Sequence, residues 1–576
     1  MAVCFFSGSV NQVNAQGTPA LLSAKVDALF AEWNKPGSPG AAVGVVHQGK
    51  LIYAKGFGEA DLETGARIGP ETIFHIASVS KQFTAYAIVL LAQEGKLSFD
   101  DDIRVYLPEV PDFGKKITIR HLIYHTSGLR DQWALLAMAG WQMDDVITKQ
   151  HIINLVKRQR ELNFDPGTEF SYSNTNYTLL AEIASRVGKQ PFSDWMREHV
   201  FTPLGMKNTQ FYDDHERIVK NRAYSFYKDP NSSSSVYRKS VLSYANVGAT
   251  GLFTTVTDLV KWVATFQKMQ VGKPTTMGQM LERGRLTKGD TLPYSFALFH
   301  GKYKGLDQYG HDGADAGYRS FMCYFPKADY GFIVLSNAAE LNPAQSAYAM
   351  ADIYLANQVK EDKSNKPAAK IADARGYQVD GKRLDQYLGD YQLAPGFVLS
   401  FKREGDRFMG QATGQPPFEL SALSDTTFYL KVVEARVTFH KPVNGNVTRL
   451  TWHQNGDHPA MRVEAFTLSK EQLQVYTGKY YSPELETIYT INLTNDTLKL
   501  AHVHYGETTL KPVAKDRFET SWRLLQSFYL TQSIALVRNA NEEIIGMRIS
   551  NGRVRNVWFK RLAADFEGDK SPMANK

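Results

Sequence analysis

The 576-residue sequence has only two cysteines, Cys4 and Cys323, which excludes a disulfide framework and argues against a cysteine-based zinc site. Long apolar runs are also missing. The uncharged stretch Ala85–Ala92 is far shorter than the roughly 20 residues that a membrane-spanning helix needs, so we expect no integral membrane segment. The net charge of +7 is spread along the chain rather than gathered in a stripe, which indicates no nucleic-acid partner.

The first residues carry part of a secretory pattern. A short apolar patch is followed by Val13, Asn14 and Ala15, a small-residue cleavage site, but the charged start and most of the apolar core of a signal are missing. We expect residues 1–19 to be a signal remnant or disordered, and the protein to be periplasmic or secreted.

Residues 20–357 show the pattern of one large domain with helices and an antiparallel sheet. Two pairs of apolar runs around a turn, at residues 41–58 and 321–337, predict hairpins, and residues 343–358 predict a closing helix. We expect a sheet built from both ends of this region, with the helical middle packed as a second lobe. The chain is too long for a single hydrophobic core, so further domains should follow.

The rest of the chain reads as a linker and two repeated units. Residues 358–377 are charged and rich in alanine and lysine, without an apolar period, as is typical of a linker. Beyond them, short segments with alternating apolar residues form an internal repeat with an offset of about 90 residues. The segment at Tyr387 resembles the segment at Tyr476. We expect two small antiparallel β-barrels of about eight strands each, at residues 378–470 and 471–565, and a disordered tail at 566–576.

Two Ser-x-x-Lys patterns occur in the sequence, and one of them precedes a helix. Ser225 and Lys228 stand before a turn-rich stretch, whereas Ser78 and Lys81 lead into an apolar helix that ends at Gly95. Residues three apart on a helix can touch, so Ser78 rather than Ser80 should meet Lys81. A lysine buried there should have a lowered pKa and could act as a base toward a serine nucleophile.

Two later motifs could complete such a site. Tyr172-Ser173-Asn174 follows a Pro-Gly turn and precedes a helix, so the tyrosine could shuttle protons while the amide bonds both a substrate carbonyl and the lysine. The same pattern recurs at Tyr244-Ala245-Asn246, but without the turn-to-helix setting. His311-Asp312-Gly313 enters an apolar strand, where Gly313 permits close backbone approach and the next N–H, from Ala314, could point at a substrate oxygen.

Taken in order, Ser78-x-x-Lys81, Tyr172-x-Asn174 and His311-x-Gly313 resemble the three motifs of the penicillin-recognising serine hydrolases. The Tyr-x-Asn form resembles the class C β-lactamase branch and its esterase and D-peptidase relatives. Three further segments, at residues 117–129, 203–209 and 251–262, are similar to segments characteristic of the family. The resemblance implies an α/β (α+β) catalytic domain of the β-lactamase/transpeptidase type, which the two lipocalin-like β-barrels would follow.

The resemblance also implies roles for the residues. Ser78 would attack a carbonyl carbon and form an acyl-enzyme, with Lys81 taking its proton and Tyr172 relaying protons to the leaving group. Asn174 would orient the substrate, and the N–H groups of Ser78 and Ala314 would form the oxyanion hole. The expected partner is a small molecule or short peptide, with no metal or organic cofactor; the oligomeric state is left open.

The third motif departs from the pattern of many β-lactamases and cell-wall peptidases. They carry Lys-Thr-Gly there, and its lysine helps to bind a substrate carboxylate; His311-x-Gly313 is instead the form of D-aminopeptidases and some esterase-like relatives. We therefore expect a hydrolase of a small amide, D-amino-acid peptide or ester. The alternatives are a carboxylesterase, a β-lactamase or cell-wall D,D-peptidase, and a non-catalytic muropeptide or glycan binder.

In the D-aminopeptidase arrangement, a barrel loop can reach the active site. Residues 411–420 and 502–509 are the two candidates for such a loop here. His502 and His504 should share a strand face, but two histidines without a third ligand indicate surface residues rather than a metal site.

Overall fold

The computed structural model describes the chain with gaps. The described residues are 18–229, 232, 236–359, 377–394, 397–412, 417–430, 435–441, 447–454, 456–463, 466–523 and 529–563. The expected signal segment and linker lie almost wholly outside these residues, and the expected tail lies wholly outside them.

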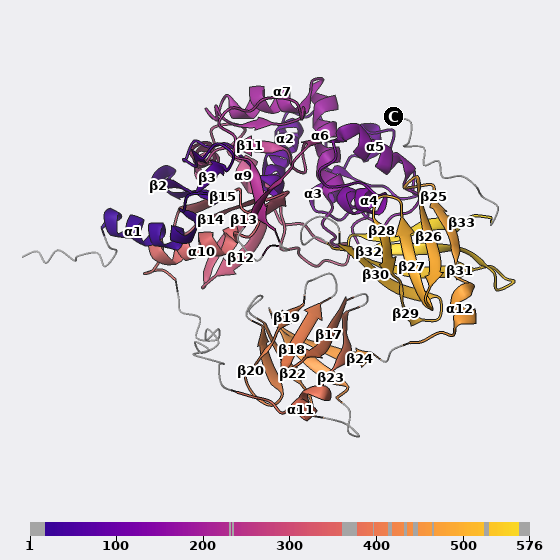
Figure 1. Ribbon diagram of the computed structural model, residues 1–576. Coiled ribbons are helices and arrows are strands. Elements are labelled where there is room, and N and C mark those ends of the chain that lie inside the picture. The colour runs from indigo at the N-terminus through magenta and orange to yellow at the C-terminus, as the bar shows by residue number, and fades with distance from the viewer. Residues whose placement is uncertain are drawn as a thin grey trace, which may run out of the picture.

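A six-stranded antiparallel sheet forms the centre of residues 20–357 (Figure 1). The strands, in spatial order, are β12 (Phe299–Tyr303), β13 (Leu306–Asp315), β14 (Tyr318–Phe325), β15 (Tyr330–Ser336), β1 (Ala41–His47) and β2 (Lys50–Phe57). Ala41 of β1 pairs with Ser336 of β15, so the two ends of the region meet side by side, as the two hairpin patterns predict.

Helices cover both faces of this sheet. Helices α1 (Pro19–Leu29) and α10 (Pro343–Tyr354) pack together on one face, where Val26, Val43 and Met350 belong to one buried cluster. Helix α8 (Val256–Ala264) packs on the other face, next to the helical lobe. The lobe contains α2 (Lys81–Gln93), α3 (Ile119–Ile123), α4 (Gln132–Met138), α5 (Lys149–Arg158), α6 (Asn174–Gly188), α7 (Phe192–Met196) and α9 (Thr276–Met280).

Short strands and turns connect these elements. The strands are β3 (Glu59–Asp61), β4 (Ala66–Arg67), β5 (Phe74–His75), β6 (Ile147–Thr148), β7 (Gln210–Phe211), β8 (Ser225–Lys228), β9 (Tyr237–Ser240), β10 (Tyr244–Ala245) and β11 (Leu252–Thr254). The single-turn elements are η1 (Ala31–Trp33), η2 (Ala77–Ser80), η3 (Ile103–Val105) and η4 (Arg197–Phe201).

Helix α2 lies inside the lobe, which agrees with its apolar sequence: its residues from Lys81 to Leu91 are all buried, and it packs against α6. The helix begins at Lys81, so Ser78 stands on the preceding 3₁₀ turn, η2, rather than in the helix itself. Ala77, just before Ser78, has a φ of 46°, a left-handed conformation that costs an alanine of order 1 kcal/mol and is common next to functional groups.

Two nine-stranded, nearly closed antiparallel sheets follow, one strand more in each than expected. The first contains α11 (Gly381–Asp385) and β16 (Gly389–Ala394), β17 (Phe397–Glu404), β18 (Arg407–Ala412), β19 (Phe418–Glu419), β20 (Ser421–Ala422), β21 (Thr427–Leu430), β22 (Ala435–Phe439), β23 (Arg449–His453) and β24 (Asp457–Val463). The second contains α12 (Lys470–Gln474) and β25 (Gly478–Ser482), β26 (Thr487–Thr494), β27 (Thr497–His502), β28 (Gly506–Thr509), β29 (Lys511–Ala514), β30 (Arg517–Arg523), β31 (Tyr529–Arg538), β32 (Ile544–Asn551) and β33 (Val554–Arg561).

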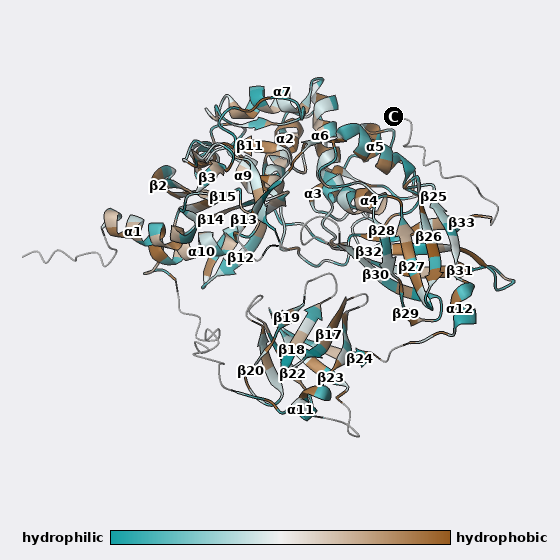
Figure 2. Cartoon of the chain, viewed as in Figure 1, coloured by the Kyte–Doolittle hydropathy of each residue, from teal (hydrophilic) through white to brown (hydrophobic). Residues whose placement is uncertain are grey.

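The two barrels have the same strand order, β19-β18-β17-β16-β24-β23-β22-β21-β20 and β28-β27-β26-β25-β33-β32-β31-β30-β29, which confirms the predicted repeat. Hydrophobic and hydrophilic residues alternate along their strands (Figure 2), as expected when one face of a strand is buried inside a barrel.

The barrels differ in how they meet residues 20–357. The first has a buried cluster of its own, whereas the buried residues of the second, such as Tyr489 and Phe559, are continuous with the core of the helical lobe. In Figure 1 the second barrel sits against α4 and α5, and the first stands apart. No helix among the described residues is both long enough and apolar enough to cross a membrane.

Candidate active site

Ser78 and Lys81 are in direct contact. The Oγ atom of Ser78 accepts a hydrogen bond from the Nζ atom of Lys81 at 2.9 Å, and Ser78 is partly accessible between buried neighbours. The Oγ atom of Ser80 faces elsewhere and accepts a hydrogen bond from the backbone N–H of Leu252 at 3.2 Å. The i, i+3 geometry expected from the sequence therefore holds although η2, not α2, carries the serine.

Lys81 is fully buried and bound on three sides. Besides Ser78, its Nζ atom donates to Oδ1 of Asn174 at 2.8 Å and to the carbonyl oxygen of Ala249 at 2.6 Å. Burial lowers the pKa of Lys81 to about 7, although the carboxylates of Asp315 and Asp131 oppose the shift. Near neutral pH, a substantial fraction of this lysine is therefore an uncharged amine that can accept a proton.

Asn174 is held by a residue that the sequence analysis missed. Its backbone N–H and its Nδ2 atom both donate to Oδ2 of Asp131, at 2.7 and 2.8 Å. The other carboxylate oxygen of Asp131 accepts from the backbone N–H groups of Trp133 and Ala134 and so caps the N-terminus of α4. The available signal was its position, two residues after the family-like segment 117–129.

Tyr172 lies between Lys81 and His311. The Nζ atom of Lys81 is 4.9 Å from the centroid of the Tyr172 ring, and the hydroxyl of Tyr172 is 3.4 Å from Nε2 of His311. Burial raises the pKa of Tyr172 well above its usual range, against a hydrogen bond from Ser78 that lowers it, so its phenol stays protonated near neutral pH.

His311 is buried and uncharged near neutral pH. Burial lowers its pKa to about 4, more than the nearby Asp312 carboxylate raises it. Its Nδ1 atom lies 2.6 Å from the carbonyl oxygen of Asp312, which assigns the ring proton to Nδ1 and leaves Nε2 as an acceptor toward Tyr172.

A second buried histidine, also missed by the sequence analysis, supports the tyrosine. The ring of His125 is 4.2 Å from the ring of Tyr172, centroid to centroid, and its Nδ1 atom accepts the backbone N–H of Ser173 at 3.1 Å. Burial lowers the pKa of His125 well below its usual range. His125 belongs to the family-like segment 117–129, but nothing in the sequence indicates which motif it contacts.

Strand β13 lies directly against η2. A side chain at Gly313 would place its first carbon 2.4 Å from the carbonyl oxygen of Ile76 and 3.0 Å from the backbone nitrogen of Ser78. The glycine therefore permits the close approach that the sequence analysis expects. Ala314, the next residue on β13, is exposed.

The barrel segment that reaches the site is neither of the two expected loops. It is the two-residue turn between β32 and β33, whose Arg553 places its guanidinium carbon 5.1 Å from the centroid of the Tyr172 ring. Residues 502–509 contact α4 instead, where the hydroxyl of Tyr505 donates to the carbonyl oxygen of Ala137 at 2.9 Å. Part of the other candidate, residues 413–416, lies outside the described residues.

The recurring motifs lie elsewhere. Ser225 is on a strand and donates its hydroxyl to the carbonyl oxygen of Ser240, and Tyr244 stacks on Trp133. His502 is buried, contrary to the expectation of a surface residue, and contacts Thr487; His504 follows the end of β27 rather than sharing the strand. No cluster of potential metal ligands occurs in the part of the chain that the structure describes.

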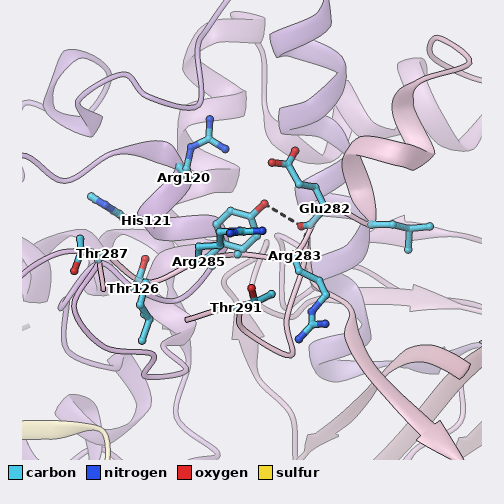
Figure 3. A pocket seen from close by; sticks show the side chains of 13 residues that line it. Arg120, His121, Thr126, Glu282, Arg283, Arg285, Thr287 and Thr291 are labelled. Carbon is cyan, nitrogen blue, oxygen red and sulfur yellow. Dashed lines mark hydrogen bonds between the residues drawn. The ribbon is translucent and has the colours of Figure 1, made fainter. Parts of the chain in front are cut away.

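A cavity of about 630 Å³ opens beside α3, and none of the predicted site residues lines it. Figure 3 shows Arg120, Arg283 and Arg285 around it. At its edge, the hydroxyl of Tyr124 donates to the carbonyl oxygen of Glu282 at 2.9 Å. The chemistry of the Ser78–Lys81 pair, not this cavity, identifies the candidate active site.

The sheet and the helical lobe define a protein of the β-lactamase fold. Residues 26–356 match the family described as Beta-lactamase, so the chain belongs to that family, whose members are serine hydrolases. Residues 375–465, around the first barrel, match a domain of unknown function, DUF3471.

Individual proteins are similar to this chain over different lengths. Penicillin-binding protein 4* of Bacillus subtilis (strain 168) is 27% identical over 429 residues, which cover 72% of this chain and 93% of that protein. Protein flp of Staphylococcus aureus (strain MRSA252) is 30% identical over 310 residues, 52% of this chain and 59% of that protein. The structure of the octameric penicillin-binding protein homologue from Pyrococcus abyssi matches with a TM-score of 0.53 and 22% identity, over 77% of this chain and 99% of that one, which shows the fold.

Proposed function

We propose that this protein hydrolyses a small amide, D-amino-acid peptide or ester through an acyl intermediate on Ser78. The observation that carries the proposal is Lys81: a buried amine with a pKa of about 7, whose Nζ atom is 2.9 Å from the serine oxygen. A serine hydroxyl is a weak nucleophile until a neighbouring base takes its proton, and this lysine has both the position and the basicity to do so.

In the acylation step, Oγ of Ser78 bonds to the substrate carbonyl carbon while its proton passes to the uncharged amine of Lys81. The bond from that carbon to the leaving group then breaks, and the proton held by Lys81 passes through the hydroxyl of Tyr172 to the leaving group, which restores the uncharged amine. Water attacks the ester in the second step, releases the acid and restores the proton to Ser78. The bond from Lys81 to Oδ1 of Asn174 leaves the Asn174 amide beside the lysine, where it can orient the substrate.

The remaining predicted residues take supporting roles in this proposal. The N–H groups of Ser78 and Ala314 stabilise the developing oxyanion, an effect worth about 3 kcal/mol per donor in comparable sites. Support comes from the close approach of Gly313 to the backbone nitrogen of Ser78. His311, uncharged and with Nε2 as acceptor, orients the hydroxyl of Tyr172 without adding a charge to the site.

Three other functions remain as alternatives. A carboxylesterase and a β-lactamase or cell-wall D,D-peptidase would use the same machinery, and the name of the Bacillus subtilis relative points to penicillin binding. Parallel assays with D-alanine p-nitroanilide, p-nitrophenyl butyrate and a chromogenic cephalosporin distinguish these enzymes. A non-catalytic muropeptide or glycan binder would turn over none of them, and the lowered pKa of Lys81 argues against it.

Intact-mass analysis with a fluorophosphonate tests the proposal. The wild type and Ser80→Ala should gain one adduct, located on the peptide that contains Ser78, and Ser78→Ala should gain none. Ser80→Ala is the matched control because its hydroxyl bonds to Leu252 and not to Lys81. An adduct that survives in Ser78→Ala, or a wild type that remains unlabelled, contradicts the proposal.

A further inference from the structure

Arg553 brings a cation from the second barrel to the candidate active site. It stands at the tip of the β32–β33 hairpin, and its guanidinium carbon is 5.1 Å from the centroid of the Tyr172 ring. Within about the same distance, the ring of Tyr172 also meets the Nζ atom of Lys81. The catalytic region alone, residues 20–357, does not contain this cation.

The hairpin tip is fixed by its backbone, so the side chain is free to bind something else. The carbonyl oxygen of Arg553 accepts hydrogen bonds from the backbone N–H of Asp131, at 3.4 Å, and from Nδ2 of Asn163, at 2.9 Å. The next strand is held by Arg130, whose guanidinium donates twice to the carbonyl oxygen of Arg555.

Arg553 is exposed, and its guanidinium forms no ion pair with any residue that the structure describes. Two acids of the same site, Asp131 and Asp312, make other contacts. Asp131 accepts four N–H groups from Asn174, Trp133 and Ala134, and Asp312 has a largely exposed carboxylate beside the His311 ring. The charge of Arg553 still reaches the site, because it lowers the pKa values of Lys81 and Tyr172, while Asp312 raises both.

We propose that Arg553 binds a carboxylate on the leaving-group side of the substrate, beside the hydroxyl of Tyr172. The inference rests on the proposed function, in which Tyr172 delivers the proton to the leaving group. A guanidinium can bind a carboxylate through two parallel hydrogen bonds, and it also stacks on an aromatic ring, as this one does on Tyr172. The preferred substrate is therefore an amide or ester whose departing part is acidic, such as a peptide with a free C-terminal carboxylate.

This assignment gives the second barrel a role in the site. His311, the other basic side chain beside Tyr172, is a neutral, buried imidazole and supplies no positive charge there. Arg553 supplies a cation from a different part of the chain. Specificity for an acidic leaving group would then depend on the docked barrel, although the bond-breaking residues all belong to the catalytic region.

A matched pair of esters tests the assignment. We expect the wild type to hydrolyse 3-carboxyphenyl butyrate with a kcat/KM about tenfold above that for 3-carbamoylphenyl butyrate, a size typical of one charge-assisted interaction. Arg553→Gln should reduce this ratio to about one, and Arg553→Lys should keep part of it, because a lysine retains the charge but not the fork of donors. A wild-type ratio near one, or an unchanged ratio in Arg553→Gln, overturns the assignment.

Arg555→Gln is the control, since it removes the same charge from the same hairpin but from a side chain that is paired with Glu169 at 2.9 Å. It should keep the wild-type ratio. A fall in kcat/KM for both esters by the same factor in Arg553→Gln would mean that Arg553 acts only through Lys81 or the fold, and would also overturn the assignment.

A binding measurement separates this proposal from the proposed function. The leaving group itself, 3-hydroxybenzoate, should bind to Ser78→Ala at least about fivefold more tightly than 3-hydroxybenzamide, and the difference should vanish when Arg553→Gln is added. If Ser78 is not labelled by the fluorophosphonate and neither ester is cleaved, the proposed function fails, while the binding difference still decides the role of Arg553.

Discussion

The chemistry of Lys81 is set by its surroundings. Water does not reach it, its three hydrogen-bond acceptors carry no formal charge, and the two nearby carboxylates only partly offset the loss of hydration. Because desolvation destabilises the ammonium, its pKa falls to about 7. The same lysine on an open helix surface would stay protonated and could not serve as a base near neutral pH.

We expect the pH dependence of acylation to report this lysine. The uncharged amine is the active form, so kcat/KM for a neutral ester should rise with pH, with an apparent pKa of about 7, and level off above it. Values of kcat/KM measured from mildly acidic to mildly alkaline pH test for this rise. Lys81→Arg should remove it together with nearly all activity, because a guanidinium stays charged throughout. If the rise of kcat/KM with pH persists in Lys81→Arg, the titration belongs to another group.

At the residue scale, short-range patterns could be predicted and long-range partners could not. Ser78 and Lys81 are one helical turn apart, so their contact follows from local geometry. Asp131 and Arg553 reach the site only through the tertiary fold, and no spacing rule links either of them to Tyr172. Asp131 even fits the ordinary pattern of a helix N-cap, which conceals its second task of holding Asn174.

At the scale of elements, the site depends on the close approach of η2 and β13. The turn presents Ser78 and the strand presents Ala314, and Gly313 is the point at which their backbones meet. The sequence indicates a glycine that permits close approach, but not what approaches it. The start of α2 illustrates the same limit: the apolar pattern predicts a helix, while the left-handed Ala77 and the 3₁₀ turn before it leave no trace in that pattern.

Gly313→Ala should therefore separate the strand from the nucleophile. The added methyl group would lie 2.4 Å from both the carbonyl oxygen of Ile76 and the hydroxyl of Ser320, so the backbones must move apart. We expect kcat/KM to fall by about a hundredfold, as a displacement of about 1 Å can cause, with a smaller effect on thermal unfolding.

The control for this change is Gly301→Ala on β12 of the same sheet. There the new carbon would meet only the end of the Gln308 side chain at 3.1 Å, which can move aside. It should keep near wild-type activity. If Gly313→Ala retained full activity, the apposition of η2 and β13 would not matter for catalysis.

For the whole molecule, the two barrels arise from one repeated pattern but stand in different relations to the catalytic region. The repeat itself could be predicted, because alternation and turn residues recur at the same spacing in both copies. The sequence could not predict which of the two barrels docks on the helical lobe, since docking depends on single side chains. Tyr489 and Tyr505 donate to the carbonyl oxygens of Met138 and Ala137 at the end of α4, and Glu484 pairs with Arg130. These contacts bring Arg553 to Tyr172.

The Arg130–Glu484 pair is a buried ion pair among these contacts, with side chains 1% and 4% exposed and a nitrogen-to-oxygen distance of 2.8 Å. Glu484→Ala would leave the buried arginine charge with only the half-exposed carboxylate of Glu161, 3.9 Å away, and losing the close partner costs about 3–5 kcal/mol in comparable pairs. We expect a lower unfolding midpoint in urea and faster proteolytic release of the second barrel. The preference for the carboxylate ester should also fall in Glu484→Ala, because the hairpin that carries Arg553 is held by the same arginine.

The double variant Arg130→Met/Glu484→Leu removes both charges, so it should be more stable than Glu484→Ala, since apolar side chains often replace a buried ion pair without loss of stability. A double variant that is less stable than Glu484→Ala would show that the bonds from Arg130 to the carbonyl oxygen of Arg555, rather than the ion pair, hold the barrel in place.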